Sequence, residues 1–176
     1  MTAKKILFTG LPRSGKTTLI ESLVKHIKSP ATGFFTREIK EKGHRVGFSI
    51  HTLDGKQGLL AHQRIKSRYR VGKYGVVIDD IDRVAVPSML PEKPDTIVVI
   101  DEIGKMECFS PLFRKTLVKI LDSDHPVLGS IALKGDRFMQ EITARQDLTV
   151  VHVTLQNRDS LAKSYANLNR LQSKVK

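Results

Sequence analysis

A short stretch near the amino terminus carries a pattern that proteins use to hold phosphate groups. It runs from Gly10 to Thr17 and reads Gly-Leu-Pro-Arg-Ser-Gly-Lys-Thr, with its glycines, lysine and threonine at the required spacing. Glycines let backbone N–H groups approach a triphosphate closely, and a following helix adds its free N-terminal amides and the positive end of its dipole. The sequence therefore predicts that this stretch binds a nucleoside triphosphate.

The side chains of this loop have separable expected roles. Lys16 is expected to reach the β- and γ-phosphates as a catalytic cation, and the Thr17 hydroxyl to ligate Mg²⁺. For Ser14, ligand contact and a helix-start role remain open, and for Arg13 we favour a solvated side chain over phosphate contact. The predicted nucleotide-binding residues of the loop are Gly10, Leu11, Pro12, Arg13, Ser14, Gly15, Lys16, Thr17 and Thr18.

The second candidate feature is a pair of acidic residues at the end of an apolar run. Residues 96–100 read Thr-Ile-Val-Val-Ile and are followed by Asp101 and Glu102, which is typical of a buried parallel strand with acids at its carboxyl end. Ligands bind at that edge in open α/β sheets. We expect Asp101 to face the Mg²⁺ shell and Glu102 to turn out of the strand and orient the attacking water.

Three further positions are candidates with competing interpretations. Asn157 and Arg158 follow the last predicted strand, where they are expected either to contact the nucleotide base or to start a helix. Arg137 is a candidate arginine finger, although a solvated arginine at a helix start is the favoured interpretation. Lys105 is the better pocket candidate because it stands close after Glu102.

The elements that must position these residues follow from hydrophobic periodicity. The sequence predicts strands at 5–9, 96–100, 126–133 and 148–155, and helices at 16–27, 81–90, 111–121 and 136–142. A final helix from about 159 is expected to bury Leu161, Tyr165, Leu168 and Leu171. Residues 33–61 alternate between apolar and polar and contain turn signals, which favours an antiparallel meander inserted into the βα alternation. The expected fold is α/β, with a largely parallel sheet and helices on both faces.

The composition fits one domain over residues 1–176, of which 40% are apolar. No apolar run approaches the ~18 residues of a membrane span, and no signal-type segment follows Met1. One cysteine, Cys108, excludes an internal disulfide, and the six histidines lack metal-ligand spacing. We therefore expect a cytoplasmic protein without membrane contact, and the sequence leaves its oligomeric state open.

The charge balance attracts anions. Thirty basic and eighteen acidic side chains give a net charge of +12. The densest basic stretch runs from Arg64 to Lys73 and has Tyr69 within it and Tyr74 beside it, a pattern also seen where proteins contact nucleic acid. We favour a solvated basic loop here, with nucleic-acid binding as the alternative.

Several segments resemble one known family. Residues 101–107, Asp-Glu-Ile-Gly-Lys-Met-Glu, are similar to the DEIGKME signature of the thermophile-type nucleoside-triphosphatase family, which includes the cancer-related nucleoside triphosphatase of animals. Residues 33–38 resemble its G-F-x-T-x-E segment, residues 72–74 resemble its V-G-x-Y element, and residues 153–159 add a further match. Two departures are Cys108, where an aliphatic residue is usual, and Arg37, a base inside the second motif.

The resemblance implies a compact three-layer P-loop domain of the RecA-like type with an extra catalytic glutamate. It also implies Mg²⁺-dependent hydrolysis of ATP, GTP and other triphosphates to diphosphate and phosphate, with broad base selectivity. Two other functions stay open from the residues alone. A small nucleotide or metabolite kinase would use the same loop, although Glu102 beside the γ-phosphate argues against it. A nucleotide-dependent RNA-binding module has only the basic stretch as support.

Overall fold

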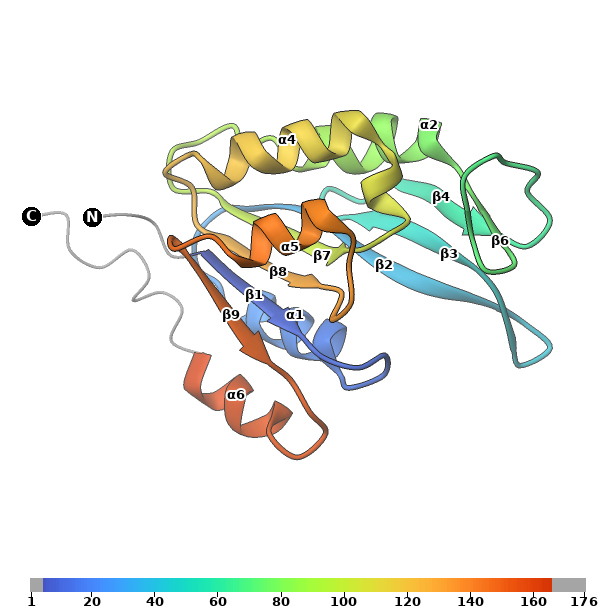
Figure 1. Cartoon of the computed structure of the whole chain (residues 1–176). Helices are drawn as coiled ribbons and strands as arrows, with labels where there is room; N and C mark the ends of the chain where they lie inside the picture. The colour runs from blue at the N-terminus through green and yellow to red at the C-terminus, as the bar shows by residue number, and fades with distance from the viewer. Residues whose placement is uncertain (1–4, 166–176) are drawn as a thin grey trace, which may run out of the picture.

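The computed structural model describes residues 5–165, which form one mixed nine-stranded sheet with helices on both faces (Figure 1). The strands are β1 Lys5–Thr9, β2 Ala31–Glu41, β3 His44–Thr52, β4 Gln57–His62, β5 Arg70–Val71, β6 Tyr74–Val76, β7 Ile97–Ile103, β8 Val127–Ile131 and β9 Leu148–His152. The helices are α1 Lys16–Lys25, α2 Ile78–Asp80, α3 Val86–Ser88, α4 Pro111–Leu121, α5 Arg137–Thr143 and α6 Arg158–Tyr165, with a π-helical turn η1 Ile81–Ala85 and a 3₁₀ turn η2 Glu107–Phe109. The strand order is β5-β6-β4-β3-β2-β7-β8-β1-β9.

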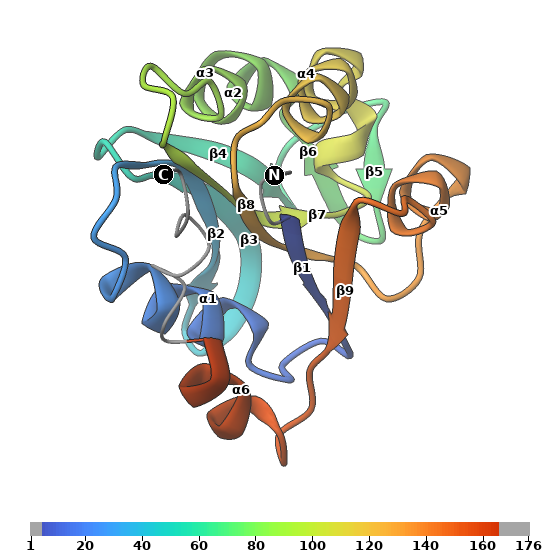
Figure 2. The same cartoon turned by 90° about the vertical axis from the view of Figure 1, so that its left-hand side faces the viewer.

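The parallel half of the sheet consists of β2, β7, β8, β1 and β9. Helix α1 packs on one face through Leu19, Ile20 and Leu23, and α6 lies beside it. Helices α4 and α5 and the helical segment 78–88 cover the other face (Figure 2). This arrangement confirms the predicted α/β fold with helices on both faces. Within residues 5–165, no helix has both the length and the apolar character needed to cross a bilayer.

The predicted antiparallel meander extends the same sheet. Strand β2 pairs in parallel with β7 as far as Phe35, which lies opposite Asp101. From there to Glu41, β2 pairs only with β3. The outer part of β2 and the start of β3 therefore project beyond the carboxyl edge of the parallel strands, as the long ribbon in Figure 1 shows. Buried Ile50, Leu60 and Val76 from these strands join the cluster under α4, so the meander shares the core of the parallel half.

The segment predicted as one helix over 81–90 is helical from Ile78 to Ser88 and is interrupted by a π-turn. Proline has no N–H, so Pro87 cannot donate to the carbonyl of residue 83 as a regular α-helix requires. The Val86 N–H bonds to the Ile81 carbonyl, five residues back, which widens the helix there. The prediction recognised the apolar spacing but missed the effect of this internal proline.

Smaller differences concern the last elements. Ser110 caps α4 by accepting a hydrogen bond from the Phe113 N–H. Leu112 is 44% exposed, because one residue along a helix turns the side-chain direction by about 100°, away from that of buried Phe113. Asp136 caps α5 by accepting a hydrogen bond from the Met139 N–H, so the helix predicted over 136–142 begins at Arg137. Strand β9 ends at His152. In α6, Leu161 and Tyr165 are partly buried against the α1 cluster, whereas Leu168 and Leu171 lie outside the described residues.

Candidate functional site

The loop between β1 and α1 has the backbone geometry of an anion cradle. Gly10 has a φ of +154°, and a Cβ on it would collide with the Val153 carbonyl. Gly15 has a φ of +93°, and a Cβ on it would collide with the Arg158 side chain. Helix α1 begins at Lys16 without a side-chain cap and without an acidic residue in its first turn. Its N-terminal amides are therefore available to an anionic ligand, as the glycine pattern predicted.

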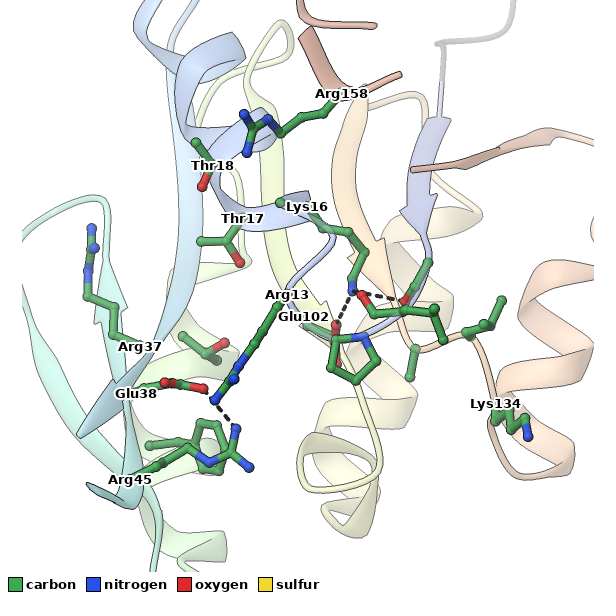
Figure 3. A pocket seen from close by; sticks show the side chains of 18 of the residues that line it. Arg13, Lys16, Thr17, Thr18, Arg37, Glu38, Arg45, Glu102, Lys134 and Arg158 are labelled. Carbon is green, nitrogen blue, oxygen red and sulfur yellow. Dashed lines mark hydrogen bonds and ion pairs between the residues drawn. The ribbon is translucent and has the colours of Figure 1, made fainter. Parts of the chain in front are cut away.

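Lys16 joins this loop to the end of β7 (Figure 3). Its side chain is buried, and its Nζ donates to the carbonyl oxygens of Gly10 at 3.0 Å and Leu11 at 3.1 Å. The same Nζ lies 3.9 Å from Glu102 Oε2. An ammonium held by two neutral carbonyls can turn to a phosphate at little cost, because charge-assisted hydrogen bonds are the stronger ones.

The carboxyl end of β7 lies beside the loop. Its ladder to β8 is interrupted between Ile100 and Ile103, which frees Asp101 and Glu102 from regular alternation, as the sequence predicted for Glu102. Asp101 is only 1% exposed and accepts a hydrogen bond from the Ser130 hydroxyl at Oδ1. Burial raises the pKa of Asp101, while the hydrogen bond from the Ser130 hydroxyl, the nearby Thr17 hydroxyl and the charge of Lys16 lower it.

Glu102 turns toward the open side of the loop, where its side chain is 34% exposed. Partial desolvation raises the pKa of Glu102 to about 7, against the favourable charge of Lys16, and the nearby Asp101 raises it further. A carboxylate whose pKa is near neutral both accepts and releases a proton readily. Asp101 is therefore a buried carboxylate and Glu102 a partly exposed one, as the predicted roles of ligand and base require.

A cavity of about 850 Å³ opens over the loop. The predicted residues that line it are Gly10, Leu11, Pro12, Arg13, Gly15, Lys16, Thr17, Thr18, Glu102 and Arg158. Asp101 lies beneath the lining, and Ser14 is buried behind the loop with a hydroxyl that has no partner within residues 5–165. Ligand contact by Ser14 stays a prediction.

The two residues expected at the base have different surroundings. Arg158 lines the cavity and lies against Gly15, and its Nε is 3.1 Å from Asp159 Oδ1 (Figure 3). Asn157 is absent from the described lining, and its amide bonds to the backbone of its own turn, accepting from Thr154 N and donating to the His152 carbonyl. The structure thus gives Asn157 a role in fixing the turn before α6, and its contact with a base stays a prediction.

The remaining cationic candidates lie elsewhere. Arg137 is 92% exposed, pairs with Glu141 on its own helix and does not line the described cavity, in agreement with the favoured solvated interpretation. Lys105 is exposed and likewise outside that lining. Lys134 lines the cavity instead, after Ala132 and Leu133 at the end of β8. The candidate that the sequence offered after this strand was Arg137, three residues further along the chain.

Sequence reasoning missed the outer wall of the cavity. Thr36, Arg37 and Glu38 from β2 and Arg45 and Phe48 from β3 line it, together with Val71. The pattern of residues 33–61 predicted strands, but the position of these side chains depends on how far β2 extends past β7. That register cannot be found from local spacing.

Comparison with known proteins places this arrangement in a family. The model of a family described as NTPase matches residues 5–165. The chain belongs to this NTPase family. It is 44% identical over 162 residues to the nucleoside-triphosphatase THEP1 of Thermotoga petrophila, covering 90% of this chain and 89% of the relative. It is 35% identical over 176 residues to the human cancer-related nucleoside-triphosphatase, covering 90% and 93%.

Two solved structures share this fold. The crystal structure of THEP1 from Aquifex aeolicus superposes with a TM-score of 0.85 at 31% identity, covering 93% of this chain and 98% of that one. The solution structure of a human cancer-related nucleoside triphosphatase gives 0.82 at 33% identity, covering 98% and 100%. The family and its fold therefore extend over nearly all of this chain, as the DEIGKME resemblance predicted.

The two departures from the family's sequence pattern, Cys108 and Arg37, have different surroundings in the structure. Cys108 is buried in the cluster under α4, where burial raises the pKa of its thiol to about 12, so it packs as an apolar side chain. Arg37 is exposed and pairs with Glu21 of α1 at 2.8 Å while lining the cavity. The first departure is a matter of packing, whereas the second adds positive charge to the site.

Side chains of the basic stretch, residues 64–73 of this NTPase, largely contact other residues of the same chain. Arg64 pairs with Glu41, and Arg70 donates to backbone carbonyls of the same stretch. Tyr69 packs against Phe109 and lies under Arg68, and Tyr74 is buried against Phe48. These contacts agree with the favoured structural interpretation, and nucleic-acid binding stays an untested alternative.

The signature also contains an acid that sequence reasoning did not assign. Glu107, its last residue, is buried, and a Cβ on Gly104 would lie 2.8 Å from Glu107 Oε2 and 3.2 Å from Glu102 Oε1. The two carboxyl groups therefore face each other across Gly104. Burial raises the pKa of Glu107 to about 8, the charge of Glu102 raises it too, and hydrogen bonds from the backbone N–H groups of Glu107 and Gly104 lower it. The interpretation is that a protonated Glu107 supports the turn that carries Glu102.

Replacing Glu107 with glutamine is expected to reduce the pH dependence of stability. The folded state keeps a proton on Glu107 up to a pKa of about 8, against an ordinary value of 4.5 in the unfolded chain. The parent therefore loses stability as the pH rises between these values, with a slope approaching about 1.4 kcal/mol per pH unit for one proton. Urea unfolding at several pH values, with exposed Glu92→Gln as the control, measures the slope. Equal slopes in Glu107→Gln and the parent would contradict the assignment.

Proposed function

We propose that this chain hydrolyses nucleoside triphosphates to diphosphate and phosphate, uses Mg²⁺, and accepts several bases. The observation that carries the proposal is the convergence of Lys16 and Glu102, 3.9 Å apart, in front of the uncapped start of α1. A cation and a partly exposed base then flank the place where the terminal phosphate of a bound triphosphate would lie. The names of the family members support the same reaction.

The residues around Asp101 fit a magnesium ion. Asp101 Oδ2 is buried and has no hydrogen-bond partner within the described residues, and the Thr17 side chain lies beside this carboxylate. No group of three or more His, Cys, Asp or Glu side chains that could hold a metal occurs among those residues. One buried carboxylate with a hydroxyl beside it fits Mg²⁺, which proteins bind through one or two carboxylates together with substrate phosphates. A bound Mg²⁺ would neutralise charge on the phosphate oxygens.

The chain's own groups account for the remaining steps. The loop amides and the start of α1 bind the phosphates, and Lys16 exchanges its carbonyl partners for phosphate oxygens and stabilises charge that develops on them. Glu102 accepts a proton from the attacking water, which its near-neutral pKa permits. Asp101 and Thr17 are the residues that would hold the metal, while the Ser130 hydroxyl donates to Asp101 and fixes its carboxylate.

Phosphate release from ATP, GTP, CTP and UTP tests the proposal directly. We expect release from all four at rates within about tenfold of one another, because the strongest contacts are to the shared triphosphate. Chelation of the metal is expected to lower release by at least about a hundredfold, since a metal on phosphoryl oxygens supplies several kcal/mol. Release from one triphosphate alone would refute broad selectivity, and release that is unaffected by chelation would refute the metal assignment.

Arg158 is the residue through which base tolerance can be examined. A guanidinium stacks on any base through its planar face without reading hydrogen-bonding groups. Arg158→Ala is expected to raise KM severalfold for every triphosphate, since a cation–π contact at a partly exposed site is worth about 0.5–1 kcal/mol. Steady-state kinetics with each triphosphate measure the effect. An unchanged KM would remove Arg158 from the base site, and a change for one base only would make it a selectivity determinant.

A further inference from the structure

The cavity continues on the side of Glu102 that faces away from Arg158. Figure 3 shows Arg158 and Thr18 at one end, Lys16 and Glu102 in the middle, and Glu38 and Arg45 at the other end. Strand β2 brings Thr36 to Glu38 there, directly after Phe35, which pairs with Asp101. This part of the wall therefore begins next to the carboxylates that define the position of the γ-phosphate.

The far end has the chemistry of a binding site for a small molecule. Phe48 and Val71 supply apolar surface, and Glu38 supplies a carboxylate. Arg45 holds that carboxylate at 2.8 Å, donates to the Tyr74 hydroxyl at 3.2 Å and lies 5.0 Å above the Phe48 ring. These contacts fix Glu38 and Phe48 before any ligand arrives, and such preorganisation lowers the entropy lost on binding.

Positive charge dominates this cavity. Its cationic side chains are Arg13, Lys16, Arg37, Arg45, Lys134 and Arg158, against the carboxylates of Glu38 and Glu102. Arg13 and Lys134 have no ion-pair partner in the described part of the chain. Arg37 keeps an exposed pair with Glu21, the kind of pair that a bound anion can compete with at little cost. The cavity is therefore suited to a second anionic group beside the triphosphate.

Resting on the proposed function, we propose that the β2–β3 wall forms a subsite for a second small molecule that carries an anionic group and a planar ring. The ring would contact Phe48 and Val71, the anion would lie near Arg37 and Arg13, and Glu38 would accept a hydrogen bond from a hydroxyl or amino group. The cavity of about 850 Å³ is near the upper end of the roughly 300–1,000 Å³ typical of ligand pockets. The nucleoside would leave the loop on the Arg158 side, so both molecules would be bound at the same time.

AMP serves as the probe, because it combines a ring with an anion. Isothermal titration of AMP into the full chain saturated with Mg²⁺, ADP and beryllium fluoride, which imitates a bound triphosphate, is expected to show binding of AMP to the saturated complex. Inorganic phosphate and adenosine, each carrying one half of the probe, are expected to bind at least about tenfold more weakly, which corresponds to about 1.4 kcal/mol. Binding of AMP only in competition with ADP would overturn the proposal and would assign the Phe48 end to the nucleotide's own base.

Matched variants locate the subsite. Arg37→Gln and Phe48→Leu are each expected to weaken AMP binding by about tenfold and to weaken it more than ADP binding, whereas Arg64→Gln, which removes an exposed charge outside the described lining, is expected to leave AMP binding unchanged. Circular dichroism melts establish that the variants are folded. Parent-like AMP binding by both cavity variants would overturn the proposal. A parent that hydrolyses triphosphates but does not bind AMP refutes the subsite alone, whereas a parent without hydrolysis refutes the proposed function.

Discussion

Replacing Glu102 with glutamine is expected to leave nucleotide binding close to that of the parent and to lower phosphate release by about 10³–10⁴-fold, the upper range for loss of a general base. Glutamine keeps the size and one acceptor oxygen of the side chain but cannot take up a proton. Glu102 is the accessible carboxylate of the site, whereas Asp101 is buried beneath it. The substitution also removes a charge beside Lys16, so it does not weaken attraction of the triphosphate.

The measurement separates binding from chemistry. Equilibrium titration with a fluorescent triphosphate analogue gives affinity, and single-turnover phosphate release gives the chemical step. Glu141→Gln is a matched control, because Glu141 is an exposed glutamate that pairs only with Arg137 among the described contacts. Hydrolysis by Glu102→Gln at the parental rate would refute the assignment of the base. Parallel loss of binding and hydrolysis would mean that Glu102 holds the loop instead.

The phosphate loop and the acids of β7 could be predicted because their chemistry is encoded in short spacings. Gly10, Gly15 and Lys16 must be close in sequence to surround one phosphate group, and Asp101 follows a buried strand whose apolar run is plain. Their proximity in space also follows, since the carboxyl ends of parallel strands meet at one edge. The structure brings Lys16 and Glu102 together as these rules predict.

The far wall of the cavity could not be predicted in the same way. Arg45 and Phe48 line it because β2 extends beyond the end of β7 and is paired there with β3. This depends on the long-range register of the strands. Lys134 was missed for a different reason, since the end of β8 was recognised but the direction of each side chain after it was not. Glu107 gave no local signal, because an acid inside a signature is distinguished from a surface acid only by burial.

Lys16→Ala is the second substitution with a large expected effect, a fall in kcat/KM for every triphosphate of about 10³-fold, as for loss of one main charge-stabilising donor. Lys16 differs from Glu102 in acting on both the ground state and the transition state, because its charge is attracted to phosphate before and during bond breaking. Both affinity and kcat should therefore fall, which distinguishes it from Glu102→Gln.

Stability offers an independent check on the Lys16 assignment. In the free protein Lys16 donates to the carbonyls of Gly10 and Leu11, and both residues line the cavity, from which water can replace the ammonium. The melting temperature of Lys16→Ala should therefore change little while kcat/KM collapses, and Lys25→Ala, an exposed lysine in the last turn of the same helix, should change neither. A large drop in melting temperature with a fall in kcat/KM below about tenfold would reverse the argument, because Lys16 would then serve mainly to hold the loop.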